Sequence, residues 1–357
     1  MPRYTLGLCT MGNSSAALFI DGKLIAAVEE ERLTRIKNDS NFPICSITEV
    51  LSIAEINFQK IDDICIYWKP FLFHGRLLAT IKKIFSNPKN SFILMKRAFE
   101  SFFYKSSIHS SSSSWLDLFF IKTLLKKSFG DFKAKINFID HHLSHQLYAD
   151  TMHDWKEYIS LSYDGGGEVS SSVLCLVKNG NKKIISIHSW PNSLGHFYST
   201  FTGFLGFKML EGEYKMMGLA PYGKPIFKNI ILEKILKLLP DGEYKLNISI
   251  CDYHAALQSK FSGEMIKLFG EPRIKNQKVS SHHVDLAASV QAAYEEALVH
   301  LISPAIKQAP DVKRIVLSGG CALNVTANGK LISSKLFDEI IIPPAPHDAG
   351  CAIGACI

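Results

Sequence analysis

The chain has 357 residues, of which 47% are hydrophobic, and a formal net charge of +7. This length allows two lobes with separate cores, because single cores seldom grow past ~250–300 residues, and the hydrophobic content excludes a disordered chain. The sequence has no apolar run of about eighteen residues and no basic stretch leading into an apolar one at its start, which argues against a membrane span or a secretion signal. The eight cysteines form no CxxC pair. We therefore expect free, mostly buried thiols, a cytoplasmic location and no membrane partner.

The first thirty residues predict a meander of three strands. Residues 4–9 and 15–20 predict the first two strands, and the turn between them is made of small residues from Gly12 to Ser15. Asp21-Gly22 supplies a tight reversal before the third strand at 23–28, because glycine tolerates the positive φ that such hairpins need. A helix is expected to follow from Glu29.

The positive charge is concentrated in residues 69–130. Eleven lysines and arginines between Lys69 and Lys127 face only Glu100 and Asp117, a net charge of +9. Aromatic residues are mixed among the lysines, and the serine run at 110–114 predicts a loop. The segment is read either as amphipathic helices with solvated lysines or as an insert that shapes a binding pocket.

A second meander starts near residue 158. Strands are predicted at 159–163, 171–177 and 183–189, and the glycine turn Asp164-Gly165-Gly166-Gly167 follows the first of them. A strand, a small polar turn and a hairpin therefore occur twice in the chain. This repeated pattern predicts two similar α/β lobes, 1–155 and 156–357, that face each other across a cleft.

The last third of the chain combines a long helix with two further strands. Residues 280–308 predict the helix, residues 314–317 a strand that ends at the turn Gly319-Gly320, and residues 339–342 a strand before His347-Asp348. The chain ends in an apolar run without a helix-ending signal, which we interpret as a cut.

Two histidines and a distant aspartate are candidate metal ligands. If His141-His142-Leu143-Ser144-His145 is helical, His141 and His145 share one face and can reach a single ion. Asp348, at the end of a predicted strand, can complete a set of two imidazoles and one carboxylate, which suits iron, zinc or manganese. The alternatives are histidines that are merely polar and an aspartate that caps a helix.

Three small-residue turns after comparable strands predict a nucleotide cleft. They contain Gly12 and Asn13, Gly165 and Gly166 beside Asp164, and Gly319 and Gly320. Such loops let backbone N–H groups approach phosphates, although tight turns alone explain glycines equally well. Lys215 lies in a further glycine-rich stretch and is a candidate contact for an anion.

Taken together, these motifs resemble the O-carbamoyltransferases of antibiotic and nodulation-factor biosynthesis. The matching segments are 14–37, HHLSH at 141–145, YDGGGE at 163–168, 193–207, 212–223, 318–328 and 344–355. They occur in the same order as in the family, and they cover the chain except for the basic insert and the region near 225–280.

The resemblance implies an actin/sugar-kinase-like (ASKHA) fold of two ribonuclease-H-like lobes around a nucleotide cleft. It implies carbamoyladenylate, made from ATP, as the donor and a divalent metal, Fe²⁺ before Zn²⁺ or Mn²⁺, held by His141, His145 and Asp348. Asp164 and the glycines beside it would face the phosphate or the metal. Gly319, Gly320 and Asn324 would hold the adenosine, and Lys215 would contact the phosphate–carbamoyl region.

Two departures from the family pattern matter. Family members have a histidine at the position of Gly12, which is followed by Asn13 in this chain. That histidine is the family's candidate base for the acceptor hydroxyl. Either His196 substitutes, or the chain is a nucleotide-binding relative without catalysis, since losing a general base slows a reaction ~10²–10⁴-fold. Family members also continue into a C-terminal domain that forms carbamoyladenylate, and we expect this domain to be absent here.

The expected function is therefore metal-assisted transfer of a carbamoyl group to a hydroxyl of a small-molecule acceptor, such as a natural product or glycan. The expected partners are that acceptor and a carbamoyladenylate-forming domain or protein. A kinase of the same fold would leave the histidine pair without a purpose, and a nucleic acid partner is not expected.

Overall fold

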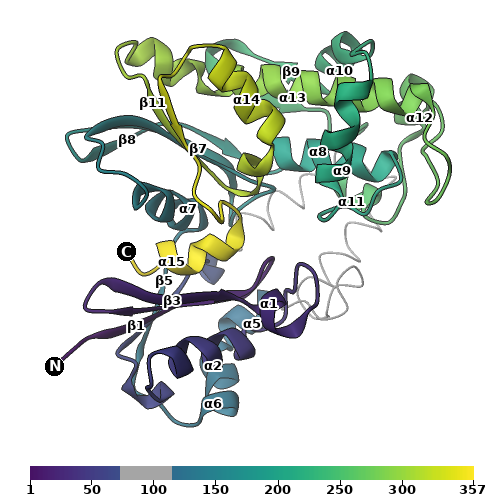
Figure 1. The fold of residues 1–357 in the computed structure, drawn as a ribbon. Helices are drawn as coiled ribbons and strands as arrows, with labels where there is room; N and C mark the ends of the chain where they lie inside the picture. Colours follow the sequence, from purple (N-terminus) through teal and green to yellow (C-terminus); the bar gives the residue numbers. More distant parts are fainter. Residues whose placement is uncertain (73–114) are drawn as a thin grey trace.

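Two five-stranded sheets carry the fold of the computed structural model, which describes residues 1–72 and 115–357 (Figure 1). The first sheet has the order β3-β2-β1-β4-β5. Its strands are β1 (Tyr4–Cys9), β2 (Ser15–Ile20), β3 (Lys23–Glu29), β4 (Asp63–Ile66) and β5 (Lys135–Phe138). The first three strands are antiparallel, whereas β4 and β5 run parallel to β1. Asp21 and Gly22 both have positive φ, which confirms the predicted reversal between β2 and β3.

The second sheet repeats this pattern, with the order β12-β11-β6-β7-β8. Its strands are β6 (Glu157–Tyr163), β7 (Ser170–Lys178), β8 (Asn181–Ser189), β11 (Arg314–Ser318) and β12 (Glu339–Ile341). Again a three-stranded antiparallel meander is extended by two parallel strands on the side of its first strand. The two hairpins from which the repeated pattern was predicted therefore belong to two sheets of the same topology.

Helices cover the outer face of each sheet and complete two separate cores (Figure 1). The first sheet carries α1 (Glu30–Thr34), α2 (Ile44–Ile53), α5 (Trp115–Phe119) and α6 (Ile121–Phe129). The second carries α8 (Leu194–Phe204), α9 (Glu213–Leu219), α10 (Lys228–Lys234), α11 (Tyr253–Ala256), α12 (Gly263–Phe269), α13 (Ser281–Gln308) and α14 (Val325–Ser333), with the hairpin β9 (Leu236–Leu238) and β10 (Tyr244–Leu246). The long helix predicted at 280–308 is α13.

Two further helices, α7 (His141–Asp150) and α15 (Cys351–Gly354), lie against each other between the sheets (Figure 1). Helix α7 follows β5 in the chain but packs on β6 and β11, whereas α15 follows β12 but packs on β1 and β2. The backbone of α15 approaches that of α7 closely at Gly354 and that of β1 at Gly7. A Cβ on Gly354 would lie 1.8 Å from the carbonyl oxygen of Ser144, and one on Gly7 would lie 1.8 Å from that of Ala352.

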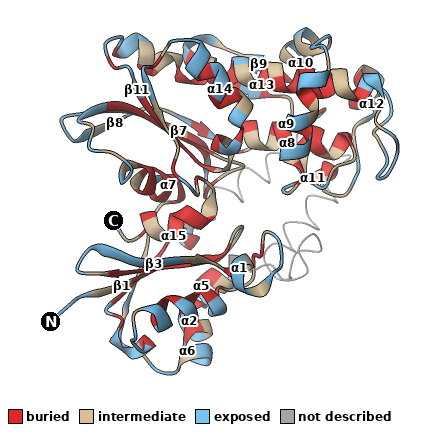
Figure 2. Cartoon of the chain, viewed as in Figure 1, coloured by how far each residue is buried: buried red, intermediate tan, exposed pale blue. Residues whose placement is uncertain are grey.

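Each lobe therefore holds one helix that belongs by chain order to the other. Figure 2 shows that both helices are largely buried. The boundary at residue 155 remains a prediction, because the sheets divide there but α7 and α15 cross it. Most of the predicted basic insert, residues 73–114 with its serine run, lies outside the described residues.

All eight cysteines are free, and five of them are buried. Among the helices of residues 1–72 and 115–357, none combines the length and the apolar character needed to cross a bilayer.

Candidate metal centre

The first turns of α7 place two imidazoles on one buried face. The helix begins after Asp140, whose side chain accepts a hydrogen bond from the backbone N–H of Leu143, and this cap satisfies an N–H group that has no partner within the helix. His141 and His145 are four residues apart and 1% and 0% exposed. The predicted HxxxH pair is therefore helical, and both rings point toward the interior between the lobes.

Two carboxylates from beyond α7 in the chain meet these imidazoles. The Nε2 atoms of His141 and His145 lie 3.4 and 3.3 Å from Oδ2 of Asp164, and 4.0 and 3.5 Å from Oδ1 of Asp348. Asp164 immediately follows β6, and Asp348 starts a short 3₁₀ turn before α15. One ligand atom from each of the four residues lies within 4.8 Å of every other.

The donor set fits a metal ion of the type expected. Bonds of about 2.0–2.2 Å from nitrogen and oxygen place ligand atoms ~3–4.5 Å apart around an ion, and the four nitrogen–oxygen distances of 3.3–4.0 Å fall in this range. Neither ring nitrogen of His141 or His145 has a hydrogen-bond partner, although all four atoms are buried. Such groups are rare in folded proteins without a compensating ligand. Two imidazoles and two carboxylates suit iron, zinc or manganese.

The two carboxylates of the cluster also favour a cation. Although burial opposes this, Cys351 together with the carboxylates raises the pKa of His145 well above its ordinary value, so a metal ion would replace the proton of this ring. Burial lowers the pKa of His141 to about 3, so its ring is neutral and keeps a lone pair for coordination. Burial opposes the ionisation of Asp164, but His141 and His145 hold the pKa of this carboxyl well below its ordinary value. Burial and the nearby charge of Asp164 raise the pKa of Asp348 to about 7. A divalent ion between the two carboxylates would offset this repulsion.

The sequence placed Asp164 among the nucleotide-binding residues that face the phosphate or the metal, and the structure brings it into the ligand set. Its Oδ1 atom accepts a hydrogen bond of 2.6 Å from the N–H of Gly165, while Oδ2 faces the imidazoles. Gly320 packs against the other side, since a Cβ there would lie 2.9 Å from Oδ1. The glycine turns thus fix the carboxylate.

The first turn, between β1 and β2, reaches the same cluster. Gly12 has φ +75°, and a Cβ on it would lie 2.5 Å from Oδ2 of Asp348. Asn13 points elsewhere: its amide donates to the side chain of Asn38, which in turn donates to the carbonyl of Leu210 in the second lobe. Gly12 therefore borders the metal ligands, and Asn13 takes part in a bridge between the lobes.

The remaining predicted nucleotide residues lie around the end of β11. Gly319 has φ +91° and approaches the carbonyl of Tyr163 so closely that a Cβ would lie 2.1 Å from it. The amide of Asn324 exchanges two hydrogen bonds with Gln291 and also caps α14 through the N–H of Ala327. Packing thus accounts for both residues, and their contact with adenosine stays a prediction.

A cavity of about 250 Å³ opens beside the cluster. It is lined by Asp164, Gly165, Gly166, Trp190, His196, Tyr253, His254 and Asp348. His196 therefore lies next to the proposed ligands. The sequence offered this residue as a substitute for the base histidine that is missing at Gly12. Lys215 is exposed on α9, with its Nζ atom 5.7 Å from the ring centroid of Tyr214, and does not line this cavity.

Several residues of the site were not singled out from the sequence. Tyr253 and His254 come from a region without recognisable motifs, so no sequence signal marked them. Glu168 ends the YDGGGE motif, and its buried carboxylate accepts hydrogen bonds from the N–H groups of Lys69 and His141. Burial raises the pKa of Glu168 to about 7. The sequence does show a glutamate directly after three glycines. Its hydrogen-bond partners, Lys69 and His141, are far away in the chain, so the sequence could not reveal the contact.

Comparisons with known proteins relate the chain to one family. A family model described as "Carbamoyltransferase N-terminus" matches residues 4–357. An uncharacterized protein of Synechocystis is 36% identical over 97% of this chain and 55% of its own length. Nodulation protein NolNO of Sinorhizobium fredii is 32% identical over 97% of this chain and 46% of its own. The chain thus spans about half the length of these curated relatives.

Among solved structures, component A of (R)-2-hydroxyglutaryl-CoA dehydratase from Acidaminococcus fermentans has a similar fold. The TM-score is 0.50 at 14% identity, and the match covers 99% of this chain and 96% of that one. This likeness confirms the predicted actin/sugar-kinase-like fold.

Proposed function

The chain belongs to the carbamoyltransferase family, whose N-terminal region it matches, and from this membership we propose what it transfers and how. The proposed reaction moves the carbamoyl group of carbamoyladenylate to a hydroxyl of a small-molecule acceptor. One divalent metal is proposed to lie between His141, His145, Asp164 and Asp348. Because the relatives are about twice as long, the donor is proposed to come from a carbamoyladenylate-forming domain or protein.

The convergence of the four ligand atoms within 4.8 Å carries this proposal. When bound, the metal would supply Lewis acidity toward the carbamoyl carbonyl. Iron is the first candidate, with zinc and manganese as alternatives. The residues present meet the requirement for such an ion because the imidazole nitrogens are buried and have no hydrogen-bond partner.

The chain's own residues supply binding and proton transfer in this proposal. The N–H groups of Gly165 and Gly319 already donate to Asp164 Oδ1 and to the carbonyl of Pro346, so the turns at Gly165–Gly166 and Gly319–Gly320 would border the nucleotide by their shape, and Lys215 would reach its phosphate from outside the cavity. The acceptor oxygen bonds to the carbamoyl carbon, the bond from that carbon to the adenylate oxygen breaks, and AMP leaves. His196, which lines the cavity beside Asp164, would take the proton of the acceptor hydroxyl.

One observation favours a second candidate, a nucleotide-binding relative without catalysis. The family's histidine is replaced by Gly12, which has positive φ and lies against Asp348. A histidine there would be strained by about 1–3 kcal/mol and would displace the carboxylate. This candidate predicts nucleotide binding without turnover.

The deciding experiment supplies the metal-loaded chain with carbamoyladenylate and a panel of hydroxylated acceptors, and detects carbamates by mass spectrometry. A carbamate that requires both metal and His196 supports transfer through this site. His196→Gln should slow transfer ~10²–10⁴-fold and leave metal content unchanged. AMP binding without any carbamate would instead support the non-catalytic candidate.

A further inference from the structure

Two cysteines that are far apart in the sequence meet where α15 packs on the first sheet. Cys65 lies in β4, and Cys356 follows the end of α15. In the parallel register of β1 and β4, Cys65 is paired with Gly7, so both residues point to the same face of the sheet. A Cβ on Gly7 would lie 2.6 Å from Sγ of Cys356. The sulfur of Cys356 therefore fills the place of a side chain at Gly7, directly beside Cys65.

This arrangement brings the two sulfur atoms within reach of a covalent bond. Neighbouring strands lie about 4.7–4.9 Å apart, so a sulfur above Gly7 is one side-chain length from Cys65. The Cβ atoms of a disulfide need a separation of about 3.5–4.5 Å, which is close to this spacing. Cys65 is 8% exposed and Cys356 is partly exposed, so a small oxidant can reach the pair.

The surroundings of Cys65 favour its thiolate form. A hydrogen bond with the Cys356 thiol lowers the pKa of Cys65, and although burial and Asp63 oppose this, Asn137 and Arg3 lower it further. Asn137 is the register partner of Cys65 on β5. The same hydrogen bond raises the pKa of Cys356 well above its ordinary value, so this thiol keeps its proton. Because the thiolate is the reactive form of cysteine, Cys65 is the nucleophile of the pair.

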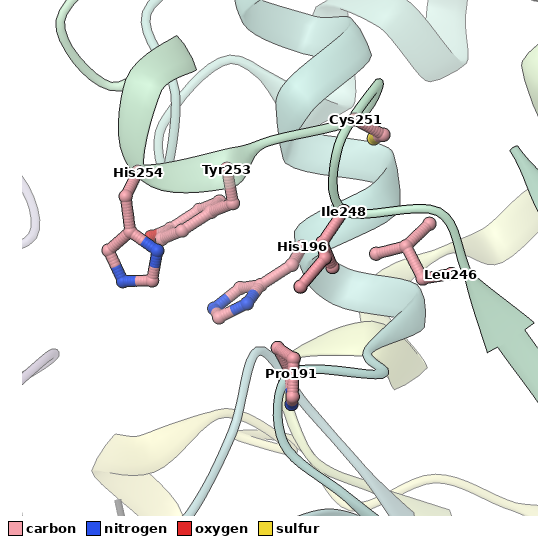
Figure 3. A pocket seen from close by; sticks show the side chains of 7 residues that line it. All are labelled: Pro191, His196, Leu246, Ile248, Cys251, Tyr253 and His254. Atoms are coloured by element: carbon pink, nitrogen blue, oxygen red, sulfur yellow. The ribbon is translucent and has the colours of Figure 1, made fainter. Parts of the chain in front are cut away.

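Three other cysteines have different surroundings. Cys45 is exposed, yet desolvation and a hydrogen bond with Glu30 raise the pKa of its thiol. Burial raises the pKa of Cys175. Cys251 is buried and lines a small cavity beside Leu246 and Ile248 (Figure 3), where none of the other lining residues is a cysteine. A thiol favoured as thiolate with a second thiol at its side is the arrangement found in redox-sensing cysteines.

We propose that Cys65 and Cys356 form a redox modification site, which hydrogen peroxide converts to a disulfide. The Cys65 sulfur attacks one peroxide oxygen, the O–O bond breaks, and the products are a sulfenic acid and one water. The Cys356 sulfur then bonds to the Cys65 sulfur, and the sulfenic hydroxyl leaves with the Cys356 proton as a second water. Two thiols together lose two electrons and two protons, and one peroxide is reduced to two waters.

The disulfide would fasten α15 to the first sheet. This helix also packs on α7, which carries the two histidines of the proposed metal centre. The bond would close a loop that contains most of the chain, and cross-links over long loops restrict the unfolded state most. The oxidised chain is therefore expected to resist unfolding better than the reduced chain.

Peptide mapping of the wild-type chain tests the proposal. The reduced chain is treated with hydrogen peroxide, and a chelator is present so that no redox-active metal takes part. Remaining thiols are blocked with N-ethylmaleimide, and a non-reduced digest is examined by mass spectrometry. A peptide that links Cys65 to Cys356 is the expected product. The melting temperature should rise by about 3–5 °C on oxidation, and dithiothreitol should reverse both changes.

Serine variants provide the controls. Cys65→Ser and Cys356→Ser should each abolish the linked peptide and the rise in melting temperature, whereas Cys45→Ser, which removes an exposed thiol, should keep both. A disulfide between other cysteines, conversion of Cys65 to a sulfinic acid without a disulfide, or no linked peptide at a dose that oxidises Cys45 overturns the proposal. Because the peptide map uses the wild-type chain, a serine variant that fails to fold leaves the test intact.

Discussion

At the scale of single residues, His145 decides whether the metal centre exists. Its ring is 0% exposed and faces both Asp164 and Asp348. We expect His145→Ala to lower metal affinity by more than the ~10–100-fold lost with an outer hydrogen-bonding partner. Metal content after dialysis, measured by mass spectrometry, checks this.

The neighbouring histidine provides the control. Both ring nitrogens of His142 have partners, Ser162 Oγ and the carbonyl of Ser170, so His142→Asn should keep the metal. Equal metal content in the two variants would contradict the assignment of ligands.

Glu213 gives a prediction about pH. Burial raises the pKa of this carboxyl, although it accepts hydrogen bonds from Ser199 and the N–H of Leu210. A raised pKa means that the folded state binds the proton more tightly than the unfolded state. Glu213 therefore disfavours folding increasingly as pH rises from the unfolded value, about 4.3, through the folded one. Glu213→Gln should raise the melting temperature more at pH 8 than at pH 5, and equal changes at both would refute this.

Individual site residues could be predicted only where chain spacing reveals geometry. His141 and His145 share a helix, so their spacing of four was enough to suggest a common ligand. The joint approach of Asp164 and Asp348 depends on two strand ends meeting in space, and the sequence suggested it only through resemblance to a family. Tyr253 carries neither signal, because a lone aromatic residue has the same appearance in a core as in a cavity.

At the scale of elements, the cap of α7 links helix stability to the metal. Asp140→Ala removes the hydrogen bond to the N–H of Leu143 and should destabilise the protein by about 0.5–2 kcal/mol. It should also weaken metal binding, since the first turn holds His141. Denaturant unfolding and metal titration measure the two effects.

Ser262→Ala is the matched variant, because Ser262 caps α12 through the N–H of Met265 and has no part in the metal centre. It should lose comparable stability with unchanged metal affinity. If both variants weaken metal binding equally, the effect is one of global stability.

Elements with strong local signals were predicted well, and those without them were not. The strands of both meanders alternate with turns that need glycine or asparagine, so β1, β2 and β6 were found within two residues of their ends. The short helices α10 to α12 and the hairpin β9–β10 lack a clear period, and tertiary packing determines them.

At the scale of the whole molecule, the contact between α7 and α15 joins the two lobes. A Cβ on Gly354 would lie 1.8 Å from the carbonyl of Ser144, which directly precedes the ligand His145. Gly354→Ala should therefore destabilise the protein by about 1–3 kcal/mol and reduce metal affinity. Thermal melts with and without metal measure both.

The control for Gly354→Ala is a glycine in a helix that has free space around it. A Cβ on Gly329 in α14 meets nothing within 4 Å, so Gly329→Ala should stabilise the protein by about 0.5–1 kcal/mol. Destabilisation of the same size at both positions would show that the close approach of α7 and α15 has no special role.

The exchange of helices between the lobes divides the metal ligands between two bodies. His141, His145 and Asp164 lie on elements that pack with the second sheet, whereas Asp348 leads directly into α15, which packs on the first sheet as well as on α7. Any hinge motion that parts the sheets must then stretch the coordination sphere, so ion binding and domain closure are thermodynamically coupled and each strengthens the other. A bound ion would shorten the lifetime of the open form, and the escape of a spent nucleotide would become slower than in the metal-free protein.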